Sequence, residues 1–518
     1  MINFRAAISA ALLLFVPVTV AQAQDVTLSS PDGAVEITGN LLGFDGEFYR
    51  VETKFGELTL DGSGVSCDGP GCPSLSDFVA EVTLSGSAKM AEVLLPALIE
   101  GFALRNGYKT QRVALDEDNF EYLLQQSDGR SVARFSFLVS STDVGFADLI
   151  AQQADIVMAL REIRPSEQSL ARAAGLGDMT TAVRSRIVAL DAMVPVVSPE
   201  NPVTRISIPD LAAVFSGAIT NWQVLGGPDA PISVHMPLEN SGLTQGFADR
   251  VLAASGVQLT QDLRHHERGT TLVRRVATDP FAIGIASFSN TGTSRILTLT
   301  GSCGFLLRAN RRGIKTEDYP LTAPMFLYLP QRRLAKVARD FLAYVRGPGA
   351  QIVIRRAGFV DQAPERISMN AQGDRLSNAI LAAGPEVQLA ELQRLVNSLT
   401  GFRRLTTSFR FEAGSSRPDA QSRSNVAQLA RALETGLYDG KVLNFVGFSD
   451  GDGAASGNRT IALRRAETVR DAVLSTAEEG SVARVKVQVE AFGEALPMAC
   501  DDSDWGRQVN RRVEVWVQ

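Results

Sequence analysis

Cysteine and histidine are scarce in this 518-residue chain, with 4 cysteines and 3 histidines. Cys67 and Cys72 lie five residues apart in CDGPGC, without a second cysteine pair or a histidine near them in sequence. A structural zinc site takes four such ligands, so neither a metal nor a cofactor is predicted. His265 and His266 are adjacent in RHHERGT but have no third ligand at metal-site spacing, which indicates a charged loop pair.

The chain also lacks the residue patterns of common hydrolases. The run GFSDG fits the Gly-x-Ser-x-Gly pattern around Ser449, but that fold requires a histidine after the serine, and all three histidines precede it. We find no catalytic triad, no cysteine–histidine nucleophile and no closely spaced carboxylate cluster with metal-site periodicity. An enzyme is therefore not expected.

Basic clusters with interleaved aromatic residues are absent, and the formal net charge is −6, so nucleic acid is not an expected partner. Long apolar runs are confined to residues 1–23, where Arg5, AAISAALLLFVPVTV and the small-residue ending AQA are typical of a cleaved secretory signal. No cysteine follows the expected cleavage point, so a lipid anchor is not indicated. We expect an exported, soluble protein.

Export to an oxidising compartment favours disulfides. Gly and Pro between Cys67 and Cys72 permit a tight loop, so a local disulfide is predicted there. Cys303 and Cys500 could pair across two domains or remain separate. Around the first pair, residues 24–79 alternate in short bursts such as VEITGNLLGF and GELTLDG, which predicts a small β module.

A polar corner is predicted near the C-terminal end, in GFSDGDGAASGNRTIALRRA. Asp450 follows the strand-like KVLNFVG, and Asn458 and Arg465 lie seven residues apart, which is close to two helical turns and puts them on one face. If the strand exit and the helix form one corner, they present a carboxylate beside a guanidinium. Such a corner suits a ligand that carries both an ammonium and a carboxylate.

This spacing resembles the peptidoglycan-binding domain of the OmpA family. The resemblance covers residues 403–518, from TSFRFEAGSSRPDAQ through AFGEALPM to NRRVEVWV. It implies an α/β sandwich with helices on one face, whose Asp450 and Arg465, with Asn458, hold the diaminopimelate of the wall peptide. The family's usual His and Thr before the Asp are Phe448 and Ser449 here. Neither of these two differences removes the charged pair.

Earlier in the chain, three strand-to-helix connections are rich in small polar residues. Backbone amides and hydroxyls at such connections suit an oxyanion, although each group could instead only cap its own helix. Converging in one cleft, they would form an anion site. The residues concerned are Ser85 and Ser87 in the first connection, Ser140, Ser141 and Thr142 in the second, and Asn240, Ser241, Gly242 and Thr244 in the third.

Residues 80–362 resemble the phosphate-type periplasmic substrate-binding proteins of ABC transporters. The landmarks are SGSAKMAEVLLPALIEGF, ADIVMALREIRPSE, IPDLAAVFSGAITNWQVLGG, ENSGLTQGF, DPFAIGIASF, YPLTAP and GFVDQ. The resemblance implies a two-lobed type II α/β fold that closes around an anion, phosphate by default.

The pocket departs from the family pattern. An arginine and a threonine of the family are replaced by Pro237 and Leu243, and Leu160 stands where a small or acidic residue is usual. Lys89 or Arg161 could restore the lost charge, but not the bidentate geometry of the missing arginine.

Residues 363–402 contain leucines at helical spacing, and Pro385 divides them into two short helices, which predicts a helical linker. The whole chain is thus expected to be a multidomain α/β protein in the periplasm, on the wall or outer-membrane side. Two functions remain open. One is a phosphate or anion receptor for an ABC transporter permease, tethered noncovalently to peptidoglycan; the other is a wall-anchored structural or sensing module whose lobes no longer take up phosphate.

Overall fold

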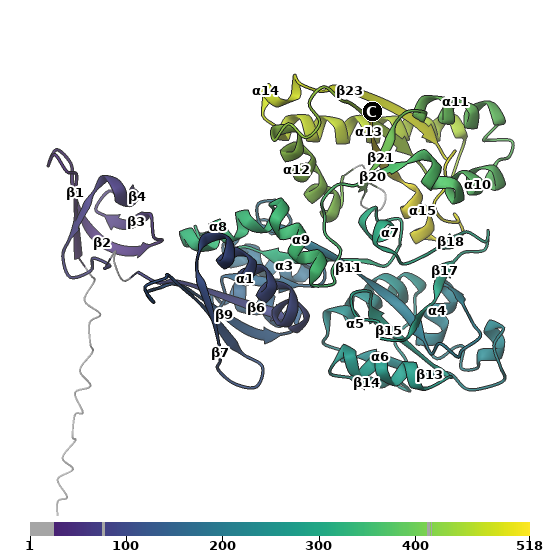
Figure 1. Ribbon diagram of the computed structural model, residues 1–518, viewed down its shortest axis with the longest axis horizontal. Helices are drawn as coiled ribbons and strands as arrows, with labels where there is room; N and C mark the ends of the chain where they lie inside the picture. Colours follow the sequence, from purple (N-terminus) through teal and green to yellow (C-terminus); the bar gives the residue numbers. More distant parts are fainter. Residues whose placement is uncertain (1–24, 75–77, 412–414, 416) are drawn as a thin grey trace, which may run out of the picture. The chain divides into compact units, whose positions relative to one another are not determined.

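The computed structural model describes residues 25–74, 78–411, 415 and 417–518 (Figure 1). They form two compact units, one up to Ala80 and one from Glu81 onward. The expected signal peptide, residues 1–23, lies outside the described residues. Among the helices that are described, none is long and apolar enough to span a membrane.

The first unit is a single antiparallel sheet in the order β4-β3-β2-β1-β5. Alternate residues of β1 and β3, among them Leu28 and Val51, point to one side and form its small core. A disulfide joins Cys67 and Cys72, in agreement with the sequence, and staples this core. The strands are β1 (Asp25–Ser29), β2 (Glu36–Phe44), β3 (Phe48–Thr53), β4 (Gly56–Asp61) and β5 (Ser66–Asp68).

The second unit begins with a long mixed sheet in the order β14-β13-β15-β11-β19-β10-β6-β9-β8-β7. Strand β11 (Ser185–Val197) pairs with β19 (Thr322–Tyr328) along its first part and with β15 (Ala282–Ser287) along its last part. It therefore runs from one lobe into the other. The remaining strands are β6 (Ala80–Ser87), β7 (Lys109–Ala114), β8 (Phe120–Gln125), β9 (Ser131–Ser140), β10 (Ile156–Ala159), β13 (Ser233–Pro237) and β14 (Arg264–His266).

Helices pack against this sheet in both lobes. In the first lobe, α1 (Leu95–Asn106) packs against α8 (Lys336–Val345) and α9 (Pro348–Arg356). In the second lobe, α6 (Gly269–Thr278) packs on β13 and β15. This is the two-lobed α/β arrangement that the sequence predicts.

One local prediction about this sheet is wrong. Ser85, Gly86 and Ser87 were expected in a loop, but they form the end of β6, paired with β10. Gly86 has a φ of +125°, and a Cβ at this position would lie 2.4 Å from the carbonyl oxygen of Met158. Only glycine allows this close approach, so the strand continues to its last serine.

The C-terminal sheet has the order β20-β21-β24-β22-β23. Alternate residues such as Phe445 and Val515 pack under α12 (Ala420–Glu434) and α13 (Ala455–Thr476). Its strands are β20 (Arg366–Ser368), β21 (Arg403–Arg410), β22 (Val442–Phe448), β23 (Lys486–Gly493) and β24 (Arg512–Val517).

The opposite face of this sheet is also covered, contrary to the expectation of helices on one face. Val446 and Trp516 belong to a second core with residues of α10 (Gly373–Ala382) and α11 (Leu389–Leu399). Both helices come from the segment predicted as a helical linker, which also supplies β20. The apolar residues on this second face require cover, and the neighbouring segment provides it.

The receptor lobes and the C-terminal sheet share a buried junction. Asp318, just before β19, accepts hydrogen bonds from Arg404 at 2.7 and 3.0 Å and from Arg410 at 3.1 Å. Cys303 and Cys500 form a disulfide across 197 residues, so of the two alternatives left open by the sequence, pairing across domains is the one observed. Beside it, the amide of Ser302 donates to Asp502 at 2.7 Å.

Candidate functional site

A cleft of about 620 Å³ lies between the two receptor lobes. Polar residues from all three predicted connections line it together with apolar side chains such as Leu160, Leu243 and Phe359. The three connections therefore converge, as the sequence predicts. The predicted residues that line the cleft are Ser87, Lys89, Ser140, Ser141, Thr142, Asn240, Ser241 and Gly242.

Two of the cleft serines also cap helices. Ser141 precedes α2 (Thr142–Ile150), and its hydroxyl accepts from the amide of Val144 at 3.3 Å. Ser241 precedes α5 (Gly242–Phe247) and accepts from the amide of Thr244 at 3.2 Å. A hydroxyl that accepts a bond from the backbone still has its own proton to donate. Helix capping and anion binding are therefore compatible at these positions.

Three predicted residues do not line the cleft itself. Ser85 is fully buried and donates to Asp148 at 2.5 Å, and Thr244 is buried and donates to the carbonyl of Pro237 at 3.2 Å. Arg161 lines a separate small cavity of about 30 Å³ that Lys89 also borders.

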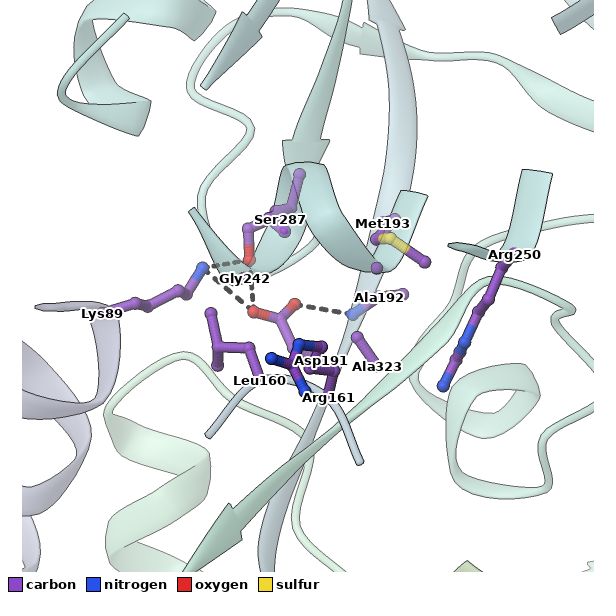
Figure 2. A pocket seen from close by; sticks show the side chains of 12 residues that line it. Lys89, Leu160, Arg161, Asp191, Ala192, Met193, Gly242, Arg250, Ser287 and Ala323 are labelled. Atoms are coloured by element: carbon purple, nitrogen blue, oxygen red, sulfur yellow. Dashed lines mark hydrogen bonds and ion pairs between the residues drawn. The ribbon is translucent and has the colours of Figure 1, made fainter. Parts of the chain in front are cut away.

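Lys89 reaches into this small cavity and contacts a buried carboxylate (Figure 2). Its Nζ lies 3.0 Å from Oδ2 of Asp191 in β11 and donates to the hydroxyl of Ser287 at the end of β15. Burial alone would raise the pKa of the Asp191 carboxyl, but Lys89 and the Ser287 hydroxyl hold it below its ordinary value. Asp191 is thus ionised at neutral pH and neutralises the charge of Lys89.

Arg161 is held in a similar way. Its guanidinium binds Glu167 at 2.6 and 2.8 Å, contacts Asp143 and donates to Gln245 at 3.1 Å. Burial opposes its charge, but these two carboxylates raise the pKa of Arg161 above its ordinary value. This arginine is therefore saturated by acidic partners.

The sequence reasoning missed Asp191, Ser287 and Ser289. Besides Lys89 and Ser287, Asp191 accepts from the amide of Ser289 at 3.1 Å and from its hydroxyl at 2.9 Å. One sequence signal could have found it: Asp191 is a single acidic residue inside the apolar run IVALDAMVPVV. A buried carboxylate needs a charged or hydrogen-bonding partner, so such a residue marks a polar site.

In the C-terminal domain, Asp450 lies directly after β22, as predicted. Its Oδ2 accepts from the guanidinium of Arg511 at 2.6 Å. Arg465, on α13, is half-buried, with its guanidinium 5.3 Å from the ring of Phe411. Burial and the charge of Arg511 lower the pKa of Arg465, while Asp450 opposes that change. Asp450 is thus paired with Arg511, and its charge also acts on Arg465.

The ion pair of Asp450 therefore involves a residue that the sequence reasoning did not name. Arg511 belongs to the closing NRRVEVWV, which was used only as a landmark of the family. Asn458, in the first turns of α13, is buried and donates to Glu494 at 2.5 Å. Burial raises the pKa of the Glu494 carboxyl. Asn458 thus tethers the loop after β23 to α13.

The histidines lie in strands, not in a charged loop. His235 of β13 and His266 of β14 stack, with Nδ1 of the first 2.8 Å from Nε2 of the second. His265 points elsewhere, to the carbonyl of Pro237 at 2.9 Å. In the part of the chain that the structure describes, no three His, Cys, Asp or Glu side chains are grouped to hold a metal ion.

Comparison with known proteins gives two matching families. Residues 73–347, more than half of the chain, match the PBP superfamily domain, and residues 410–511 match the OmpA family. The resemblances predicted from the sequence are thereby confirmed, and with them the multidomain α/β fold class.

Individual relatives cover the receptor part. Protein SphX of Synechococcus elongatus is 28% identical over 266 residues, 48% of this chain and 76% of that protein. Phosphate-binding protein PstS of Bacillus subtilis is 25% identical over 189 residues, 36% of this chain and 60%, less than two thirds, of that protein.

Among solved structures, an ABC-type phosphate transport receptor from Vibrio cholerae aligns at 18% identity with a TM-score of 0.42, covering 54% of this chain and 99% of that one. The chain belongs to the PBP superfamily and carries a C-terminal domain of the OmpA family.

Proposed function

We propose that this protein is a periplasmic receptor for a small oxyanion, with phosphate as the first ligand to test, and that its OmpA-family domain holds it noncovalently on peptidoglycan. Residues 1–23 direct export, residues 80–362 bind the anion and residues 403–518 bind the wall. An ABC transporter permease is the partner to which the receptor delivers its ligand. No catalytic step is part of this function.

The observation that carries the receptor proposal is the convergence of hydroxyl groups in one cleft. Ser87, Ser140, Ser141, Thr142 and Ser241 come from three separate connections and line the same space. Hydroxyl donors around a cavity replace the hydration shell of an oxyanion. One relative supports the same ligand class by its name, since it is called a phosphate-binding protein.

Among the residues that the structure describes, Lys89 is one of two cationic residues that line this cleft, the other being Arg268. It is the positively charged residue that both the cleft and the adjoining small cavity share. Because Asp191 and Ser287 hold its Nζ, the position of the ammonium is fixed before an anion arrives. The same contact lowers the net attraction of Lys89 for an anion, so affinity rests largely on the hydroxyls.

The wall-binding proposal rests on the corner formed by Asp450, Arg465 and Arg511. Asp450 accepts hydrogen bonds from the ammonium of diaminopimelate, and the half-buried guanidinium of Arg465 donates to its carboxylate. Arg511 fixes the rotamer of Asp450 through their 2.6 Å contact. Substituting Asp450→Ala or Arg465→Ala should abolish pull-down by isolated sacculi without loss of the fold, and unchanged pull-down by both would refute this assignment.

A second function has its own supporting observation. Both candidate cations are already paired, Lys89 with Asp191 and Arg161 with Glu167 and Asp143. This arrangement also suits a wall-anchored structural or sensing module whose lobes no longer take up phosphate.

Calorimetric titration with phosphate separates the two functions. Residues 25–518 should be unfolded, freed of carried-over ligand and refolded under oxidising conditions before titration. Saturable binding at micromolar affinity or tighter, about −8 kcal/mol, that Lys89→Gln weakens would support the receptor. No heat and no thermal stabilisation, from protein shown to be refolded, would favour the wall-anchored module.

A further inference from the structure

Three arginines from different elements meet where the receptor adjoins the OmpA-family domain. Arg186 is the second residue of β11, Arg346 caps the C-terminal end of α8, and Arg431 lies in the last turn of α12. They are far apart in sequence, and none belongs to the cleft or to the wall-binding corner described above.

Hydrogen bonds through Gln362 bring these elements together. Its side-chain amide donates to the carbonyl of Ile187, next to Arg186, at 2.9 Å. Its side-chain oxygen accepts from Gln428, one helical turn before Arg431, at 2.7 Å. Its backbone amide donates at 2.8 Å to Gln351, whose own amide binds the carbonyl preceding Arg346 at 3.2 Å.

The bridges through Gln362 place the three arginines near one another. Within the described part of the chain, none of the three forms a side-chain hydrogen bond or ion pair, and Nε of Arg186 is buried without a partner. Burial, and then the positive charges of Arg346 and Arg431, lower the pKa of Arg186 to about 10. Partial desolvation by neighbouring groups and the charge of Arg431 likewise lower the pKa of Arg346, although its side chain is exposed.

Three other arginines whose pKa values are lowered have an acid beside them. The pKa values of Arg375 and Arg512 are also lowered, but Glu514 lies against both and compensates their charge. Arg465 has Asp450 in the same role. Buried polar groups are nearly always satisfied, so the unpartnered Nε of Arg186, beside the unpaired charges of Arg346 and Arg431, indicates a missing anion.

We propose that Arg186, Arg346 and Arg431 form a second anion site, distinct from the receptor cleft, for a multiply charged oxyanion such as a pyrophosphate or phosphomonoester group. Three guanidinium groups match several oxygens of one ligand at once, because each offers a fork of donors. The ligand would join β11, which runs between the lobes, to α12 of the wall-binding domain.

Inorganic pyrophosphate is the probe of this site. Titration of the mature full-length protein at constant ionic strength should give saturable binding that persists in Lys89→Gln, because that substitution affects only the cleft. Arg346→Gln and Arg431→Gln remove exposed side chains, so both variants should fold. Each should weaken binding about tenfold or more, and the double variant about a hundredfold.

Arg470→Gln is the matched control, since it removes one positive charge from α13, where Arg470 pairs with Asp471. It should leave pyrophosphate affinity unchanged. The proposal is overturned if wild type shows no saturable binding, if Lys89→Gln alone abolishes it, if Arg346→Gln/Arg431→Gln binds as wild type does, or if Arg470→Gln weakens it equally.

Thermal unfolding without ligand gives an independent readout. Removing one of three repelling charges relieves the repulsion, so Arg431→Gln should melt at a higher temperature than wild type. Saturating pyrophosphate should raise the melting temperature of wild type but not that of the double variant. A lower melting temperature for ligand-free Arg431→Gln would mean that Arg431 stabilises the fold directly, and would contradict the proposal.

Discussion

At the scale of single residues, the contact between Lys89 and Asp191 decides how strongly the cleft attracts an anion. Asp191 is 5% exposed and is held ionised by the lysine and by hydrogen bonds from Ala192, Ser287 and Ser289. Lys89 can therefore bind a ligand at a fixed position, and Asp191 can compete with that ligand for the charge of Lys89. Substitution of the carboxylate separates these roles.

Asp191→Asn should tighten phosphate binding about tenfold, because Lys89 then lacks a counter-ion while the shape of the side chain is kept. Calorimetry against wild type measures the change. Asp143→Asn is the control, since Arg161 keeps its two contacts to Glu167. Weaker binding by Asp191→Asn would show that the carboxylate itself contacts the ligand.

The stacked histidines predict a pH dependence of stability. Burial, and then the neighbouring His266 and Arg264, lower the pKa of His235 from 6.5 to about 4. The unfolded chain therefore takes up a proton before the folded one does, so stability is complete above pH 6.5 and falls as the pH drops from 6.5 toward 4. The loss should reach about 3 kcal/mol in the free energy of unfolding.

Denaturant unfolding between pH 7 and 4 measures this loss. His235→Gln should flatten the profile in this window, whereas His265→Gln, whose side chain is outside the stacked pair, should keep the wild-type slope. Equal slopes for wild type and His235→Gln would contradict the assignment.

At the scale of elements, the sequence predicts each lobe and the wall domain from local patterns, but not the second face of the C-terminal sheet. Apolar residues fall on both faces of VLNFVGF, and in RVEVWV a tryptophan lies on the face opposite the valines, which shows that both faces need cover. The sequence does not say that α10 and α11 supply it, because their leucines would fit a free-standing helical pair equally well. The burial of the Asp318 carboxylate could not be predicted from the sequence either. Its partners Arg404 and Arg410 come from a strand 86 to 92 residues away.

Asp318→Asn tests the junction between α7 (Arg311–Lys315), β19 and β21. Burial alone would raise the pKa of Asp318, but Arg404 and Arg410 hold it well below its ordinary value. Removing the charge leaves Arg410 without its acid, and should cost about 3 kcal/mol in the free energy of unfolding. Asp340→Asn, at an exposed pair with Lys336 on α8, should cost less than about 1 kcal/mol; an equal cost for both would contradict the account.

At the scale of the whole molecule, the Cys303–Cys500 disulfide ties the receptor to the wall-binding corner. Cys500 precedes Asp501, whose carboxylate accepts from the amide of Gly451 at 2.9 Å, next to Asp450. Sequence reasoning left this pairing open because no local pattern relates residues 197 positions apart. The disulfide in CDGPGC was predictable because its two cysteines lie only five residues apart.

Cys303→Ser/Cys500→Ser should lower the free energy of unfolding by about 3 kcal/mol and weaken sacculus binding, because the loop beside Asp450 loses its covalent anchor. Thermal unfolding and sacculus pull-down measure the two effects. Cys67→Ser/Cys72→Ser, which removes the disulfide of the first unit, should leave sacculus binding unchanged. If both double variants bind sacculi as wild type does, the disulfide has no role in positioning the corner.

The most direct test of a wall-anchored anion receptor is co-sedimentation of radiolabelled phosphate with isolated sacculi in the presence of the protein. We predict that phosphate sediments in proportion to bound protein, that Lys89→Gln carries less phosphate but stays on the sacculi, and that Arg465→Ala loses both. Protein that sediments without any phosphate, at phosphate concentrations well above micromolar, would contradict the account.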